Sequence, residues 1–266
     1  WREKNPTTEP ASVLLDRIRA ERRKQWETKY PKKKYVAPEP VDDSELPELP
    51  EGWCWAGFNE CTWEITVGHV GSMKDRYIAD GVRFLRSQNV RPMRFDPAGL
   101  VHIPTAFDSE LKKSRLHGGE ILIVRSGANV GDCCVYPQNS GPANCSDLVI
   151  SRPLAGLLPE FGALFINTPE AQAALGLRTV GNAQAHFNIG AMKTTAFPLA
   201  PLEEQREVVR RLEKHGRLCH ALAAEMRRAI DDAADLDQSI LAKAFRGELV
   251  PQDPADEPAA SLLARI

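Results

Sequence analysis

Apolar side chains recur at a heptad spacing through the last third of the chain, in the stretch from Pro198 to Phe245. The steps between them alternate four and three, which is the a/d pattern of a helix that pairs with another helix. At 1.5 Å per residue such a helix spans roughly 60–70 Å, more than the width of a small domain, so we expect a second long helix beside it. An ordinary helix in a bundle is the alternative. The predicted pairing seam consists of Val208, Leu212, Cys219, Leu222, Met226, Ala233, Leu236 and Ile240.

Residues 51–200 have a different sequence pattern, in which short apolar runs are separated by Gly, Pro and Asn. This pattern is typical of short strands joined by turns. Helices are expected at Glu160–Asn167 and Pro169–Leu177, so the segment is α+β and not a regular alternation of strand and helix. The predicted strands are Cys61–Val67, Arg83–Leu85, Leu100–Ile103, Glu120–Val124, Cys133–Tyr136, Leu148–Ile150 and Thr194–Phe197.

The N-terminal part holds a short helix and a linker. Residues 11–29 place four apolar side chains on one helical face: Ala11, Leu14, Leu15 and Ile18. Residues 36–50 are rich in proline and acids and have little to bury, which is typical of a linker. We therefore predict four segments: a preceding tail and linker at 1–48, a globular domain at 49–200, the long helix at 201–246, and a C-terminal tail at 247–266.

A ten-residue sequence near the N-terminus is repeated at the C-terminus. Residues 9–18 (EPASVLLDRI) and 257–266 (EPAASLLARI) match at seven of ten positions. A duplicated unit explains this, with one copy ending near the N-terminus and the next at the C-terminus. Because the chain also begins with Trp1 and not with Met, we expect it to be a piece of a longer protein.

Composition narrows the protein class. The apolar share of 42% and the charged share of 26% are those of a globular domain. No apolar run reaches the length of a membrane span, and no signal peptide is visible, so we expect a cytoplasmic protein with no membrane contact. The six cysteines lack zinc-ligand spacing, which favours reduced and mostly buried thiols.

The net charge of −2 does not indicate nucleic-acid binding, but two local segments are basic. Residues 19–34 carry eight Lys and Arg against two Glu, which suits either phosphate binding or a solvated linker flank. Residues 74–94 carry six Lys and Arg against two Asp, with amide side chains between them. Arg, Asn and Gln can pair with base edges.

Three polar segments could supply base contacts: residues 74–94, the glycine-rich loop 125–131, and residues 179–188. Any one of them alone fits a hydrogen-bonded surface loop equally well. Together they suit the reading of a DNA groove. The candidate DNA-binding residues are Arg83, Arg86, Gln88, Asn89, Arg91, Arg125, Ser126, Asn129, Asn182, Gln184 and Asn188.

The sequence offers no constellation for catalysis. It lacks the GxxxxGK[ST] phosphate loop, a GxGxxG turn and the Asn-Pro-Pro-aromatic motif of an adenine methyltransferase. His69 and His186 have no paired Ser or Cys, and we find no metal site. A non-catalytic protein without a cofactor of its own is therefore expected.

Four stretches carry a family resemblance: LPEGW at 49–53, GGEILIVRSGANVG at 118–131, FPLAPLEEQREVVRRLE at 197–213, and SILAKAFRGELVPQDPADEPAASLLARI at 239–266. In these stretches the chain resembles the specificity (S) subunits of type I restriction–modification systems. The resemblance covers nearly the whole chain and is most specific at the two ends of the long helix. The chain differs from the family in having one recognition domain and one complete spacer.

The resemblance implies a fold and a role. Each target-recognition domain of the family is an α+β unit that reads half of a split DNA site in the major groove, and antiparallel spacer helices set the distance between the halves. DNA methyltransferase subunits dock on this scaffold and a restriction subunit joins the complex, with S-adenosylmethionine and ATP/Mg bound by those partners. A second copy of the chain, or a missing N-terminal half, would pair through the spacer helix, and a self-paired half would read a palindromic interrupted site.

Two other functions remain open at this stage. The chain could be the specificity module of a fused methyltransferase–nuclease. It could also be a protein-interaction scaffold that does not bind DNA. Salt dependence separates the second from DNA binding, because phosphate contacts weaken steeply with salt and apolar protein interfaces do not.

Overall fold

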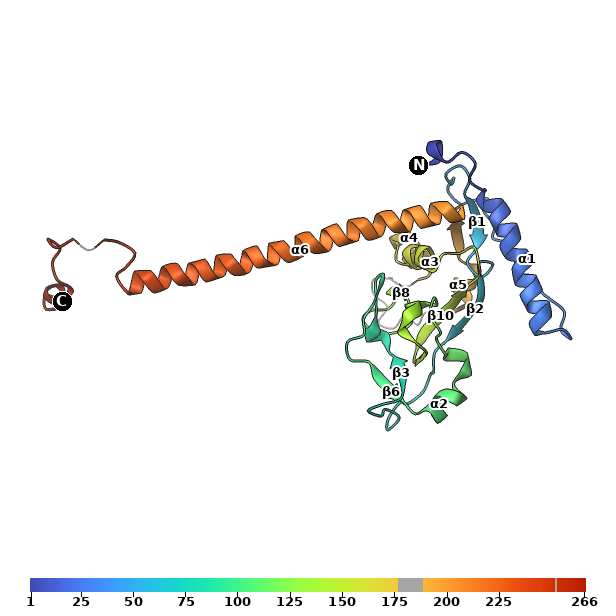
Figure 1. Cartoon of the computed structure of the whole chain (residues 1–266), viewed down its shortest axis with the longest axis horizontal. Coiled ribbons are helices and arrows are strands. Elements are labelled where there is room, and N and C mark those ends of the chain that lie inside the picture. The colour runs from blue at the N-terminus through green and yellow to red at the C-terminus, as the bar shows by residue number, and fades with distance from the viewer. Residues whose placement is uncertain (177–188, 252) are drawn as a thin grey trace. The chain divides into compact units, whose positions relative to one another are not determined.

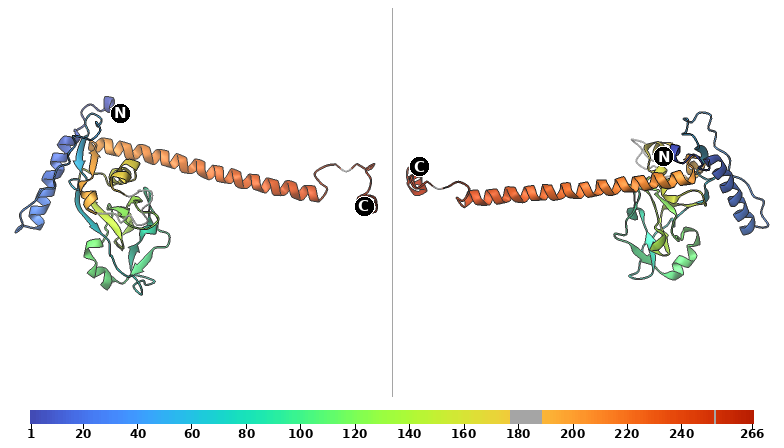
Figure 2. Two further views of the ribbon diagram at one scale, coloured as in Figure 1. Left: turned by 180° about the vertical axis from the view of Figure 1, so that it is seen from behind. Right: turned by 45° about the horizontal axis from the view of Figure 1, so that its top comes forward.

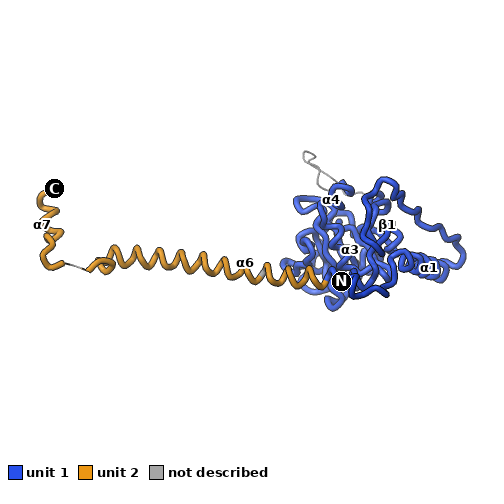
Figure 3. The backbone as a smooth tube through the Cα atoms, turned by 90° about the horizontal axis from the view of Figure 1, so that it is seen from above, with its two compact units in different colours: residues 1–209 blue, residues 210–266 orange. Residues whose placement is uncertain are grey.

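The computed structural model describes residues 1–176, 189–251 and 253–266. Within it the chain forms two compact units, Trp1–Val209 and Arg210–Ile266 (Figure 3). The sequence predicts boundaries at 48/49 and 200/201, but both positions fall inside the first unit. Each unit is described by itself below.

The centre of the first unit is an antiparallel sheet with strand order β2-β10-β7-β8. All four residues of β7 are buried, and they alternate between two cores. Ile121 and Ile123 face the larger core, whereas Leu122 and Val124 face a second core on the other side of the sheet. The strands are β2 Thr62–Val67, β7 Ile121–Val124, β8 Cys133–Val135 and β10 Leu148–Pro153.

Smaller sheets and short helices surround this sheet (Figure 1). A three-stranded sheet has the order β6-β3-β9, and two strand pairs are β1-β11 and β4-β5. These strands are β1 Cys54–Gly57, β3 Val82–Leu85, β4 Val90–Arg91, β5 Arg94–Phe95, β6 Val101–Ile103, β9 Ala143–Cys145 and β11 Ala196–Leu199. The helices between them are α2 Thr105–Glu110, α3 Pro159–Ile166, α4 Pro169–Ala174 and α5 Ile189–Thr194. The α+β prediction is confirmed.

The seven predicted strands correspond to β2, β3, β6, β7, β8, β10 and β11, with shifts at their ends. The strand predicted at Thr194–Phe197 begins too early, because α5 continues to Thr194. The predicted helix Pro169–Leu177 ends earlier, since α4 stops at Ala174. The strands β1, β4, β5 and β9 and the helix α2 were not predicted. Each has only two to six residues, which is too short for a periodic pattern of apolar side chains to be recognised.

Helix α1 (Ala11–Lys29) is confirmed, together with its predicted apolar face. Its role differs from the prediction of a tail outside the domain, because Leu14, Leu15 and Ile18 are buried in the larger core. Figures 1 and 2 show α1 lying along β1 and β2. The close approach depends on Gly156, which has φ +114° and whose Cβ, if present, would lie 2.8 Å from Ile18 Cγ1.

The long helix α6 (Leu202–Phe245) begins directly after Pro201, as the proline pattern predicts. Gln205 anchors its first turn, because its Oε1 accepts from Leu158 N at 2.8 Å and its Nε2 donates to Gly156 O at 3.0 Å. Nε2 also donates to Ala200 O at 2.9 Å. The PLEEQ stretch of the family resemblance therefore has a structural role, because Gln205 fixes the start of the helix to the first unit.

The second unit consists of the remainder of α6 and a short helix α7 (Ala259–Leu263). The α6 side chains in this unit are largely exposed. Of the predicted seam, Val208 belongs to the first unit and packs against its larger core, so it is not part of a free stripe. The seam residues that are exposed in this chain are Leu212, Cys219, Leu222, Met226, Ala233, Leu236 and Ile240.

Candidate nucleic-acid interface

Several strand ends of the first unit meet at one place. The register pairs Leu85 of β3 with Cys145 of β9, and Val124 of β7 with Leu148 of β10. A bridge between His69 and Ser146 brings the segment after β2 to the same place. The loops that follow these strands therefore lie together, and they carry predicted site residues from two of the three polar segments.

Asp147 organises the centre of this strand-end cluster. Its Oδ1 lies 3.1 Å from Arg125 Nη1, and its Oδ2 accepts a hydrogen bond from Ser126 Oγ. Asp147 stands in the two-residue turn between β9 and β10 with φ +46°, a conformation that Asp tolerates better than most residues. Asp147 was not among the predicted site residues, although a Ser-Asp pair between two apolar runs is a signal for a turn.

Arg86 is placed on the neighbouring loop. Its Nη2 donates to Gly99 O at 2.7 Å, and its guanidinium lies 5.7 Å from the centre of the Tyr77 ring. The Nε–H groups of Arg86 and Arg125 are buried and have no hydrogen-bond partner among the described residues. Both side chains are half-buried, so part of each guanidinium stays at the surface. Such held guanidinium groups are suited to a bidentate contact.

Asn89 requires a correction. It is fully buried, and its side-chain amide donates to Asp96 O at 2.9 Å and Ala98 O at 3.1 Å while accepting from Arg86 N at 2.9 Å. These bonds hold the loop that follows β3. Asn89 is therefore a scaffold residue, and its placement removes it from the candidates for base contact.

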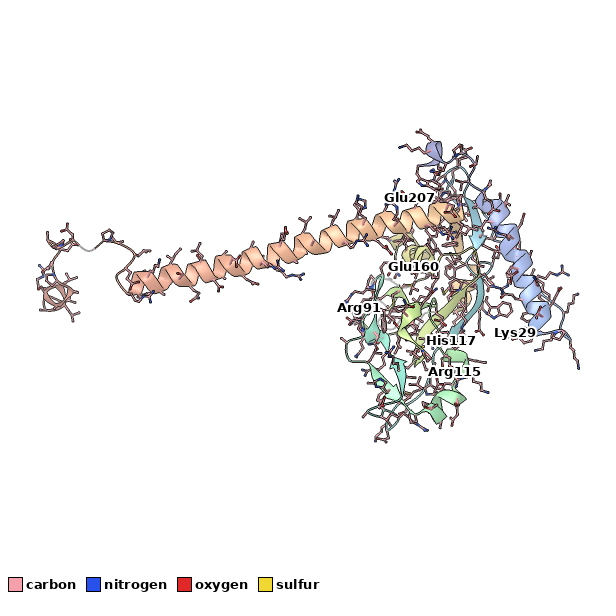
Figure 4. All side chains as sticks on the ribbon, in the orientation of Figure 1. Lys29, Arg91, Arg115, His117, Glu160 and Glu207 are labelled. Carbon is pink, nitrogen blue, oxygen red and sulfur yellow. The ribbon has the colours of Figure 1, made fainter. Side chains whose placement is uncertain are left out.

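The other predicted residues lie around the cluster and not within it. Gln88 is exposed beside Gly99, and Arg83 is exposed in the middle of β3. Arg91 lies in the β4–β5 hairpin, where its Nη1 donates to Val90 O at 3.0 Å (Figure 4). Asn129 is half-buried in the loop between β7 and β8. The remaining predicted positions, Asn182, Gln184 and Asn188, lie outside the described residues.

Two aromatic contacts next to the cluster were not predicted. Arg76 lies 4.8 Å above the Phe107 ring, and His69 meets the same ring edge-on with centroids 5.5 Å apart. Arg76 over Phe107 and Arg86 over Tyr77 thus hold two guanidinium groups against ring faces. The loop at 72–80 thus adds aromatic and cationic groups to the interface.

Thiol chemistry is disfavoured beneath this surface. Burial raises the pKa of the Cys134 thiol to about 12, and it also raises the pKa values of Cys133 and Cys145. These thiols therefore stay protonated near neutral pH. All six cysteines are free and four are buried, as the sequence predicts.

Neither a metal site nor a membrane helix is found in the described parts of the chain. No three His, Cys, Asp or Glu side chains among those residues come together as metal ligands. Of the helices in those ranges, none combines the length and the apolar character needed to cross a bilayer.

Comparison with known proteins gives one consistent family. Residues 106–231 match the family "Type I restriction modification DNA specificity domain". The chain is 30% identical over 199 residues to the type I restriction enzyme EcoBI specificity subunit of Escherichia coli. It is 30% identical over 201 residues to the EcoKI specificity subunit of Escherichia coli K12. These alignments cover 71% and 70% of the chain but 42% and 43% of the relatives, so the chain spans less than half of their length.

Solved structures agree on the fold. The HsdS subunit of Thermoanaerobacter tengcongensis superposes with a TM-score of 0.53 at 21% identity, over 90% of this chain and 57% of that one. A structure concerned with complex assembly and conformational transition of the type I R-M system gives a TM-score of 0.60 at 22% identity, over 90% of this chain and 58% of the other. Over the matched residues the chain carries a type I restriction modification DNA specificity domain.

Proposed function

We propose that the chain is a sequence-specific DNA-recognition and scaffold subunit that reads one half of a bipartite DNA site in a type I restriction–modification complex. The observation that carries the proposal is the specificity-domain match at residues 106–231, which includes Arg125, Ser126 and Asp147 of the strand-end cluster. The fused methyltransferase–nuclease is not favoured, since the relatives are named as separate specificity subunits.

The strand-end cluster supplies the chemistry of base reading. An Arg fork pairs with the two major-groove acceptors of guanine, and a carboxylate can accept from the amino group of cytosine. Arg125 and Asp147 offer both kinds of group on adjoining loops, while Arg86 and Gln88 offer a second set. Each good pair of hydrogen bonds is worth about 1–3 kcal/mol of discrimination against a wrong base.

Helix α6 supplies the scaffold. Its exposed seam pairs with a second long helix, either from another copy or from the other half of a longer subunit. Methyltransferase subunits dock on the paired helices, and a restriction subunit joins them. In this proposal S-adenosylmethionine and ATP/Mg are bound by the partners, the chain itself performs no chemical step, and the complex acts in the cytoplasm.

The test is a selection from randomised DNA duplexes with the chain bound to its methyltransferase subunit. We expect recovery of one short motif, alone or mirrored across a fixed gap. Folding is checked by circular dichroism and complex formation by size-exclusion chromatography. If the complex forms and no motif is enriched, the recognition role is refuted and a scaffold that does not read DNA takes its place.

A further inference from the structure

The last turns of α1 and the residues after it form a surface that base reading does not explain. This lysine patch consists of exposed side chains that have no ion pair to a carboxylate in residues 1–176, 189–251 and 253–266. Two nearby acids are already engaged: Glu27 pairs with Arg23 at 2.8 Å, and Glu21 accepts from Gln25. The members of the patch are Lys24, Lys29, Lys32, Lys33 and Lys34.

The patch is fixed to the recognition domain. Arg22 Nη1 donates to Asn59 O at 2.9 Å, and Arg19 pairs with the buried Glu60 at 2.8 Å. The pKa of Arg19 is raised despite the cost of burial, because Glu60 hydrogen-bonds to it and attracts it electrostatically. Since α1 also buries its apolar face, Lys24 and Lys29 stand on an ordered helix end. The other three lysines follow in the turn after the helix, where Lys33 N donates to Tyr30 O at 2.9 Å.

Aromatic rings hold part of the patch in place. Trp26 packs on Tyr30 with centroids 4.6 Å apart and meets Tyr35 at 6.2 Å. Lys29 Nζ lies 5.5 Å from the Tyr30 ring and 5.1 Å from Trp63 of β2. Lys33 Nζ lies 5.2 Å from the centre of the same Tyr30 ring. Ring faces attract ammonium groups, so these charges are preorganised before any ligand arrives.

The patch and the strand-end cluster lie at opposite ends of β2. Lys29 contacts Trp63 at the start of the strand, whereas His69 follows its end and bridges to Ser146. Six residue steps from Trp63 to His69, at about 3.3 Å each, give roughly 20 Å between the two places. This corresponds to about six base pairs of duplex at 3.4 Å each. Figure 4 shows Lys29 at the end of α1, on the opposite side of the domain from Arg91.

We propose that the lysine patch binds the phosphate backbone of duplex DNA that flanks the bases read at the strand-end cluster. The inference rests on the proposed function and adds a second, sequence-independent contact to it. Phosphate contacts set the register of a protein on DNA without reading sequence. Lysine is suited to this because its ammonium is a point charge that needs no fixed acceptor geometry. An acidic protein surface is the competing partner.

The test replaces Lys24, Lys29, Lys32, Lys33 and Lys34 by Gln in the full chain and measures DNA affinity of its methyltransferase complex against salt. Each lost phosphate contact lowers the slope of log K against log salt by about 0.9, so a loss of two to four contacts changes it by roughly 2–4. Base preference in the duplex selection stays as in the wild type. Shortening the duplex on the flanking side removes the difference between variant and wild type.

A matched pair of variants separates the patch from net charge. Lys29→Gln/Lys33→Gln removes the two ring-held charges, and Arg246→Gln/Arg265→Gln removes two exposed charges of the second unit. Only the first pair is expected to lower the salt slope. Equal slopes in both pairs, or a five-Gln variant that binds as the wild type, overturn the proposal.

Two further outcomes also overturn it and identify the alternative. A changed base preference assigns the patch to base reading. An unchanged salt slope with loss of methyltransferase binding assigns it to an acidic protein partner. Failure of the recognition role itself is recognised separately, because then the wild type selects no motif.

Discussion

At the level of single residues, the distinction that matters is between polar atoms used inside the fold and those left for a ligand. Asn89 and Gln88 are neighbours with the same amide chemistry, but Asn89 is buried with three backbone bonds and Gln88 is exposed. Sequence composition located the polar loop correctly. It could not distinguish the two residues, because the partners Asp96 and Ala98 become neighbours only when the loop closes.

This pair gives a stability prediction. Asn89→Ala leaves the carbonyl groups of Asp96 and Ala98 and the Arg86 N–H without their partner, so we expect a loss of about 2–3 kcal/mol in the free energy of unfolding. Gln88→Ala is the control and is expected to change stability by less than about 0.5 kcal/mol. Urea unfolding followed by fluorescence measures both. Equal effects of the two substitutions would contradict the scaffold role.

Asp147 gives a specificity prediction. Asp147→Asn keeps a residue that tolerates the left-handed turn but removes the charge that holds Arg125. We expect the selected DNA motif to relax or change at one position, with a change in discrimination of roughly 5- to 150-fold, equivalent to about 1–3 kcal/mol. The duplex selection measures it. A wild-type motif from the Asn variant would exclude Asp147 from reading.

At the level of elements, the sequence predicted those helices and strands whose pattern of apolar side chains is local. The α1 face follows from the spacing of Ala11, Leu14, Leu15 and Ile18, because helical periodicity is a local property. Its docking does not, since the surface that receives it includes Gly156, far along the chain. Strands of two or three residues such as β4 and β9 are defined by their pairing partners, because they are too short to show an alternation of apolar and polar residues.

The contact between α1 and Gly156 can be tested by adding one methyl group. Gly156→Ala places a carbon 2.8 Å from Ile18 Cγ1 in addition to straining a positive φ, so we expect a loss of about 2–3 kcal/mol. Gly127→Ala is the matched control, because Gly127 also has a positive φ but nothing lies within 4 Å of its Cβ position. Thermal unfolding is measured for both. A melting temperature equally lowered in the two variants would show that α1 does not press on Gly156.

The seam of α6 is the second element to test. Leu222→Asp/Met226→Asp places charges in the predicted helix pair, and we expect helix pairing and methyltransferase docking to weaken by more than about 100-fold. The first unit stays folded, because neither residue belongs to it. Ala224→Asp/Arg228→Asp places charges on the opposite side of the helix and is expected to preserve pairing. Analytical ultracentrifugation measures association, and loss of folding of the whole chain would instead favour the single-bundle alternative.

At the level of the whole molecule, the ten-residue repeat is the feature that most needs explanation. Both copies form a helix and an ion pair, Glu9 with Arg17 in the first and Glu257 with Arg265 in the second. The first copy buries Leu14 and Ile18, whereas the corresponding Leu262 and Ile266 are 50% and 96% exposed. The two copies are similar in sequence but lie in unequal surroundings, because among the described residues only the first copy is packed in a core.

The last prediction concerns how many half-sites one assembly reads. If two chains pair through the α6 seam, a two-fold protein binds a two-fold site, and the duplex selection recovers one motif mirrored across a fixed gap. Leu222→Asp/Met226→Asp should then recover the same motif without its mirror, because each recognition domain reads alone. A single unmirrored motif from the wild-type complex would show that the chain supplies only half of a subunit, with the other half-site read by a different recognition domain. The two outcomes depend only on the symmetry of the recovered DNA, so they remain distinct whichever bases Arg125 and Asp147 select.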